Sequence, residues 1–130
     1  MTTPVPYVAY LELGDTPRLV AVGCVQCGAR YLDGRAICAA CGAEEFVTVP
    51  LPSEGHLHTF TIVHAAAPGI ETPFIAAIID CEGMLVPGRI LGVPPEPDAL
   101  RIGMPVRLVT YSVGVDGTGT EAVNYAFSPC

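Results

Sequence analysis

Four cysteines stand in two short pairs of one pattern, Cys24-Val25-Gln26-Cys27-Gly28 and Cys38-Ala39-Ala40-Cys41-Gly42. Two Cys-x-x-Cys pairs at this spacing can place four thiolates around one soft divalent ion. Zinc is the default occupant, because it accepts a tetrahedron of thiolates and has no redox chemistry. The glycine after each pair allows the positive φ of a sharp turn. The sequence therefore predicts a zinc ribbon with Cys24, Cys27, Cys38 and Cys41 as ligands; the alternatives are two disulfides or four buried thiols.

Such a zinc ion is expected to be structural. A catalytic zinc keeps one position open for water or substrate, and four thiolates leave none. A small ribbon has a small core, so the ion would supply much of the cohesion of this part of the chain.

The composition favours a reduced compartment. No signal-peptide pattern opens the chain at Met1–Pro6, and no apolar run approaches the ~18 residues of a membrane span. We therefore expect a soluble, cytoplasmic protein, in which paired cysteines bind metal rather than form disulfides. Cys81 ends an apolar run and is expected to be a packed thiol. Cys130, the last residue of this sequence, is expected to be mobile.

The charge pattern argues against a nucleic-acid partner. The formal net charge is −7, whereas nucleic-acid binders carry a basic face or stripe. The six basic residues are scattered arginines: Arg18, Arg30, Arg35, Arg89, Arg101 and Arg107. The high apolar fraction suggests either a large core or an apolar surface that a partner covers.

Short strands separated by turn residues follow one another along the chain. The pattern predicts a hairpin of Tyr7–Leu13 and Arg18–Gly23 around Gly14–Pro17, with a short helix over Val5–Leu13 as the alternative. Asp33-Gly34 is the expected turn between the cysteine pairs, and Pro50–Ser53 the expected linker. Beyond the linker, strand-like composition covers Gly55–Ala66, Phe74–Cys81, Met84–Leu91, Met104–Val113 and Glu121–Phe127. Tight turns are expected at Glu82-Gly83 and Asp116–Gly119, and at most one helical turn near Asp98–Ile102.

The chain has five predicted strands and a long proline-rich connection between the third and the fourth. This number of strands and the place of the long connection match an OB-fold. An SH3-like barrel or a small sandwich fits the pattern nearly as well. We predict a mostly β chain of two domains: a rubredoxin-like zinc ribbon with an N-terminal hairpin or short helix over residues 1–50, and a five-stranded OB-fold barrel over residues 51–130.

Other candidate residues form no convincing catalytic set. By strand alternation His56, His58, Phe60, Ile62 and His64 are expected to share one face, but no further ligand at a useful spacing supports a histidine metal site. Arg89, Arg101 and Arg107 are weak candidates for binding the phosphates of CoA. A base-stacking platform is conceivable, although alternating aromatic residues are more often core; its members would be Tyr31, Phe60, Phe74, Tyr111, Tyr125 and Phe127.

The order of these stretches resembles the zinc-ribbon plus OB-fold proteins that accompany thiolases and related acyl-CoA enzymes in bacteria and archaea. The resemblance covers almost the whole chain and rests on Pro17–Val20, Cys27–Tyr31, Cys38–Gly42, Gly55–Thr61, Pro73–Ala76 and Arg101–Val106. The chain departs from the family in lacking prolines at Ala39-Ala40 and between Tyr31 and Ile37.

The resemblance implies a non-catalytic subunit that binds a thiolase-fold catalytic subunit and acts in thiolysis, condensation, acyl transfer or a retro-aldol step. It carries over the four zinc ligands and no catalytic residue. Two alternatives stay open from the residues: a stand-alone binder of acyl-CoA or another small ligand, and, less favoured by the acidic charge, a single-strand nucleic-acid binder.

Overall fold

The computed structural model describes residues 4–14, 16–32 and 36–130. These residues form ten strands and one turn of 3-10 helix, with no α-helix among them. The strands before residue 51 are β1 (Val5–Pro6), β2 (Leu11–Glu12), β3 (Arg18–Cys24), β4 (Arg30–Tyr31) and β5 (Phe46–Pro50). The later elements are β6 (Glu54–Val63), β7 (Phe74–Cys81), β8 (Met84–Ile90), η1 (Pro97–Ala99), β9 (Pro105–Val115) and β10 (Glu121–Pro129). No helix in the described ranges is long and apolar enough to cross a membrane.

The last five strands close into a barrel, as the sequence predicts. Sheet order β10-β8-β7-β6-β9 is completed by pairing of β9 with β10, and the β8–β10 pair is parallel. This order and the connection that contains η1 are those of an OB-fold. Residues facing the barrel interior are almost completely buried, and they include Leu57, Ile79, Val86, Val106 and Phe127.

Alternation along the strands explains which residues face the interior. On β7 the odd-numbered residues Ile75, Ala77, Ile79 and Cys81 are buried, while their even-numbered neighbours are half-exposed. Cys81 is 1% exposed, so the prediction of a packed thiol is confirmed. The β7–β8 turn is also confirmed: Glu82 and Gly83 have φ values of 52° and 89°, which is typical of a two-residue hairpin turn.

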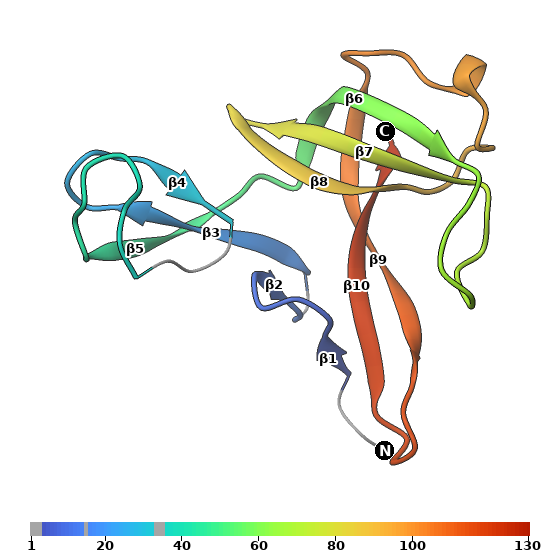
Figure 1. The fold of residues 1–130 in the computed structure, drawn as a ribbon, viewed down its shortest axis with the longest axis horizontal. Helices are drawn as coiled ribbons and strands as arrows, with labels where there is room; N and C mark the ends of the chain where they lie inside the picture. The colour runs from blue at the N-terminus through green and yellow to red at the C-terminus, as the bar shows by residue number, and fades with distance from the viewer. Residues whose placement is uncertain (1–3, 15, 33–35) are drawn as a thin grey trace.

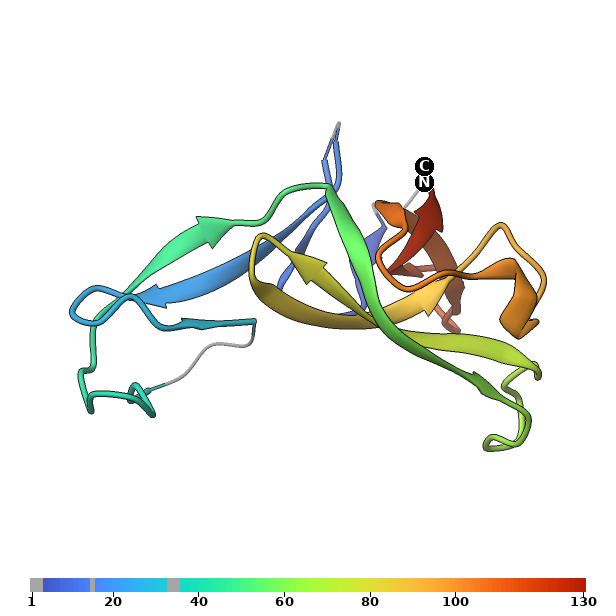
Figure 2. The same cartoon turned by 90° about the horizontal axis from the view of Figure 1, so that it is seen from above.

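The ribbon is a small antiparallel sheet in which β3 pairs with β2, β4 and β5. The predicted hairpin is present, but its first arm is only β2, and Val5–Leu13 contains no helix. The predicted turns at Gly14–Pro17 and Asp33-Gly34 include residues outside the described ranges. Figures 1 and 2 show β3 to β5 lying to one side of the barrel.

The ribbon and the barrel share hydrophobic packing. Leu11, Leu19, Ala21 and Leu51 belong to the same buried cluster as the barrel interior. Leu51, in the expected linker, is 5% exposed and its amide donates to the carbonyl of Leu19. The N-terminal segment also reaches the barrel, because β1 pairs in parallel with β10. The division of the chain at residue 50 therefore stays a prediction.

Candidate metal centre

Two nearly identical knuckles present the four cysteines. In the first, the amide of Cys24 donates to the Ala29 carbonyl at 2.8 Å, and the amide of Gly28 donates to the Cys24 carbonyl at 3.0 Å. The second knuckle repeats both bonds at 2.8 Å, with Cys38, Ala43 and Gly42 in the equivalent places. The two glycines have φ values of 79° and 80°, a conformation that only glycine adopts at little cost. Each of the two Cys-x-x-Cys-Gly segments thus forms the same turn.

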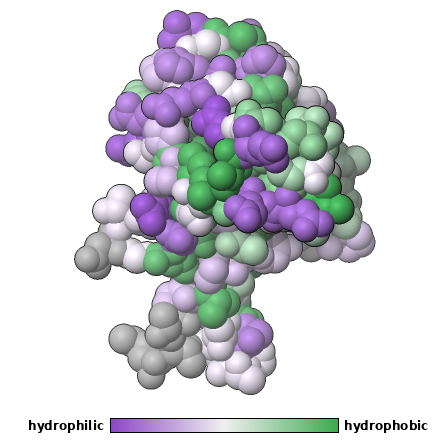
Figure 3. Space-filling view, turned by 90° about the vertical axis from the view of Figure 1, so that its left-hand side faces the viewer, coloured by the Kyte–Doolittle hydropathy of each residue, from purple (hydrophilic) through white to green (hydrophobic). Residues whose placement is uncertain are grey.

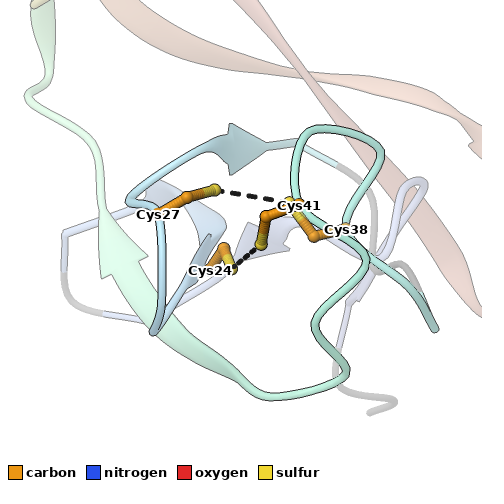
Figure 4. A group of neighbouring side chains, drawn as sticks. All are labelled: Cys24, Cys27, Cys38 and Cys41. Carbon is orange, nitrogen blue, oxygen red and sulfur yellow. Dashed lines mark hydrogen bonds between the residues drawn. The ribbon is translucent and has the colours of Figure 1, made fainter.

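The knuckles face one another, so that the four sulfur atoms converge (Figure 4). All four Sγ atoms lie within 4.8 Å of one another. The separations are 3.6 Å between Cys24 and Cys41 and 3.5 Å between Cys27 and Cys38. A disulfide would require about 2.05 Å, whereas Zn–S bonds of about 2.3 Å give tetrahedron edges of about 3.8 Å. The donor set therefore fits one tetrahedrally bound ion.

The four thiols and the groups around them shift one another's pKa values. The backbone amide of Cys27 lowers the pKa of Cys24, and the Tyr31 hydroxyl lowers the pKa of Cys38 to about 6. The amides of Ala29 and Ala43 favour the thiolates of Cys27 and Cys41. The neighbouring thiols and lost hydration outweigh those amides and raise both pKa values, that of Cys41 to about 12. Without a cation, four adjacent thiols cannot all ionise.

Tyr31 is a neighbour of the site that the sequence interpretation did not connect with the cysteines. Its hydroxyl lies 3.5 Å from the Cys38 sulfur and accepts a hydrogen bond from the Ala39 amide at 3.1 Å. Its ring packs edge-on against Phe46, with ring centroids 6.3 Å apart. Tyr31 lies four residues after Cys27 in the sequence and is part of β4, which pairs with β3, yet its hydroxyl contacts the second knuckle.

The three histidines do not form a second site. The prediction that His56, His58, Phe60, Ile62 and His64 share a face is wrong, because β6 contains a bulge at His58. Leu57 pairs with Ile79 and Thr59 with Ile78, which leaves His58 as an extra residue. Beyond the bulge, Phe60 and Ile62 pack against the core, whereas all three histidines are exposed. In the described ranges, the four cysteines are the one potential metal-binding group found.

Two of the six aromatic residues considered for a base-stacking platform lie in the core. Tyr125 and Phe127 are 6% and 0% exposed inside the barrel, and Tyr31 belongs to the ribbon. The interpretation of the aromatic residues as core holds for Tyr125 and Phe127, and Phe60 packs against the same cluster.

The three candidate arginines lie on different elements. The guanidinium of Arg89, on β8, stacks 4.1 Å above the ring of Phe74. Arg101 follows η1, Arg107 lies on β9, and both are exposed. Their binding to CoA phosphates stays a prediction. Cys130 is exposed, and its amide donates to the Pro105 carbonyl at 3.3 Å.

Similarity to known proteins extends over most of the chain. The model of the ChsH2 C-terminal OB-fold domain matches residues 48–111. A DUF35 domain-containing scaffold protein of Methanocaldococcus jannaschii is 34% identical over 116 residues, which cover 85% of this chain and 81% of that protein. The benzoylsuccinyl-CoA thiolase subunit BbsA of Geobacter metallireducens is 29% identical, with 88% of this chain and 76% of the subunit covered.

A solved structure shares both parts of the fold. The Ltp2-ChsH2(DUF35) aldolase contains a chain that superposes with a TM-score of 0.68 at 26% identity. The superposition covers 86% of this chain and 84% of that one. Because the matched region extends well beyond the barrel, the likeness includes strands of the ribbon.

Proposed function

The chain belongs to the DUF35 family, and from this premise we propose that it is a non-catalytic accessory subunit of a thiolase-like acyl-CoA enzyme. The observation that carries the proposal is the match, over more than four-fifths of the chain, to proteins named as a scaffold and as a thiolase subunit. The thiolysis, condensation, acyl-transfer or retro-aldol chemistry would belong to the partner.

The proposed metal is a structural zinc held by Cys24, Cys27, Cys38 and Cys41. The sulfur separations and the paired knuckles support this assignment, and four protein ligands leave no open position for catalysis. When bound, the ion neutralises part of the thiolate charge and fixes the second knuckle against the first. We place the complex in the cytoplasm, where cysteines at this spacing stay reduced.

The ribbon offers an exposed surface for such a partner. Val25, Ile37 and Val47 are each more than half exposed, although they lie in or beside the knuckles and β5. Figure 3 faces this end of the molecule and shows hydrophobic side chains gathered in the middle of the face, with hydrophilic ones around them. An apolar centre with a polar rim is the usual arrangement of a protein interface.

The experiment that tests the proposal is affinity purification of the tagged chain from its own cells under mild conditions. We expect a thiolase-fold protein in a fixed molar ratio, identified by mass spectrometry. The double variant Val25→Lys/Val47→Lys tests whether the ribbon surface binds the partner. It should lose the partner and keep its metal. Recovery of the wild-type chain alone, at every salt concentration tested, would contradict the accessory role.

A second candidate function is binding of a small acyl ligand. A groove of about 340 Å³ on the outer face of β6, β7 and β8 supports it. The groove is lined mainly by apolar atoms, among them those of Ala76, Ile78 and Pro87. Arg89 lies opposite Ala76 in the β7–β8 ladder and could bind an anionic group there. Calorimetry with acyl-CoA thioesters should then give heat that Arg89→Ala abolishes.

A further inference from the structure

The two residues of β4 contact opposite parts of the molecule. Consecutive side chains of a strand point to opposite faces, so Tyr31 and Arg30 extend in opposite directions from one short segment. The Tyr31 hydroxyl lies 3.5 Å from the Cys38 sulfur and accepts a hydrogen bond from the Ala39 amide at 3.1 Å. A guanidinium nitrogen of Arg30 donates to the Glu82 carbonyl in the β7–β8 turn at 2.9 Å. One residue of β4 thus contacts the candidate metal centre, and its neighbour contacts the barrel.

The same strand also lies beside the first knuckle. Arg30 pairs with Gly23, and a Cβ atom on Gly23 would lie 3.9 Å from Arg30 Cγ. Gly23 precedes the proposed ligand Cys24, whose amide donates to the carbonyl of Ala29, the residue before β4, at 2.8 Å. The strand is therefore joined to the first knuckle through its ladder with β3 and to the second knuckle through the hydroxyl of its tyrosine.

The carbonyl that Arg30 binds has no partner in the ladder of the barrel. The β7–β8 ladder ends before Glu82, which has a φ of 52°. The nearby Asp80 carboxylate is used within the turn, because it accepts a hydrogen bond from the Gly83 amide at 2.7 Å. Arg30 forms no ion pair with any described residue. Its guanidinium is thus held by the turn carbonyl and not by a carboxylate.

The ladder of β4 is too short to hold the strand firmly. It consists of two residue pairs with β3, and an isolated pair of strands is marginally stable even when it is longer. A cleft of about 510 Å³ lies between the strand and the start of β8, lined among others by Leu32 and Leu85. The second knuckle belongs to no strand. An ion bound by sulfur atoms of both knuckles would fix the second against the first.

We propose that β4 couples the metal centre to the β7–β8 turn, so that Arg30 holds the Glu82 carbonyl while the metal is bound and releases it when the metal is lost. The two states differ in the second knuckle, which is fixed with the ion and free without it. When the knuckle is free, Tyr31 loses its contacts with Cys38 and Ala39. The strand that carries Arg30 is then no longer held at that end. The proposal rests on the assignment of the four cysteines to a metal.

The coupling must act in both directions. If metal binding favours the contact of Arg30 with Glu82, that contact favours metal binding by the same factor. Arg30→Met keeps an unbranched side chain and removes every donor, so it should raise the zinc dissociation constant by about threefold or more. Arg18→Met is the matched control, because Arg18 is an arginine of the ribbon that pairs with Glu12 at 2.7 Å. It should leave the constant unchanged, as measured by competition with a coloured chelator.

Nuclear magnetic resonance of the full chain follows the contact itself. The Glu82 carbonyl and the Gly83 nitrogen belong to one peptide group, so the Gly83 amide resonance responds to the bond from Arg30. We expect this resonance to shift when a chelator removes zinc at neutral pH, while that of Gly117, in the β9–β10 turn, stays in place. In Arg30→Met the Gly83 resonance should have its metal-free position with and without zinc. In zinc-saturated Tyr31→Phe it should move toward that position.

Three results would overturn the proposal. The first is a Gly83 resonance that is the same with and without zinc in the wild-type chain. The second is an Arg30→Met variant that keeps the full shift or binds zinc as tightly as wild type. The third is a shift of Gly117 as large as that of Gly83, which would show that metal removal disturbs the whole barrel. A wild-type chain that binds no zinc would refute the metal assignment itself, and the coupling with it.

Discussion

Tyr31 connects the metal centre to the packing of the ribbon. Its hydroxyl contacts the Cys38 sulfur and the Ala39 amide, while its ring contacts Phe46. Groups that hold a metal ligand in this way usually change metal affinity when they are removed. The tyrosine therefore belongs to the candidate site, although it is not itself a proposed ligand.

We predict that Tyr31→Phe weakens zinc binding by about tenfold or more at neutral pH. The hydroxyl holds the pKa of Cys38 at about 6, so its loss raises that pKa and makes the proton a stronger competitor for the sulfur. Competition with a coloured chelator measures the effect. Tyr111→Phe, which removes a hydroxyl on the barrel, is the matched control. Equal zinc affinity in both variants and wild type would count against this role.

The second prediction at this scale concerns alkaline stability. Burial, with Asp80 and Glu82 nearby, raises the pKa of Cys81 from 9.0 to about 11. A raised folded-state pKa gives stability that is complete below pH 9 and is lost as pH rises toward 11. At pH 10.5 we expect a loss of about 2 kcal/mol relative to pH 8. Denaturant titrations of wild type and Cys81→Ala should show this loss in wild type and a smaller one in the variant.

The sequence predicts where the strands of the barrel lie. It does not predict the bulge in β6, which changes how that strand pairs with β7. Phe74–Cys81 is a strand with the predicted bounds, because it is a short apolar run ended by a two-residue turn. The bulge at His58 has no local signal, because it depends on how β6 meets β7. The same limit applies to β1 and to the contact of Tyr31 with Cys38, since both depend on pairing between distant segments.

A close approach between β6 and β7 depends on Gly55. A Cβ atom at this position would lie 2.7 Å from the Asp80 carbonyl oxygen and 2.8 Å from Ile79 Cγ2. We expect Gly55→Ala to destabilise the chain by about 1–3 kcal/mol, because a backbone atom must move. Gly117→Ala is the control, since a Cβ there meets nothing within 4 Å. Thermal unfolding distinguishes the two, and equal melting temperatures would contradict the packing described for this strand pair.

Removal of the metal should act on the knuckles before it acts on the barrel. We expect chelation at neutral pH to expose the Cys24–Cys41 segment to proteases, because Cys24 and Cys38 are the only buried residues among those described in it. The β3 residues Leu19 and Ala21 should stay protected by their packing on the barrel. Limited proteolysis with mass spectrometry follows both regions. A knuckle segment that stays resistant after complete metal loss would show that zinc is not needed for its fold.

The ribbon and the barrel are packed against each other. Tyr10 stacks edge-on against Tyr125, with ring centroids 5.7 Å apart, and the Tyr125 hydroxyl donates to the Pro87 carbonyl. Arg30 of the ribbon donates to the Glu82 carbonyl in the β7–β8 turn at 2.9 Å. If a partner binds the ribbon face, as we propose, these contacts fix its orientation relative to the barrel.

The measurement that tests the central claim most directly is the turnover of the thiolase-fold partner, assayed alone, with this chain, and with a Cys38→Ser/Cys41→Ser variant. The account predicts no turnover by this chain alone, little by the partner alone and full turnover by the pair. The variant should restore less than wild type, because its second knuckle is no longer fixed. Full turnover by the partner alone, or any turnover by this chain alone, would contradict the assignment as a non-catalytic accessory subunit.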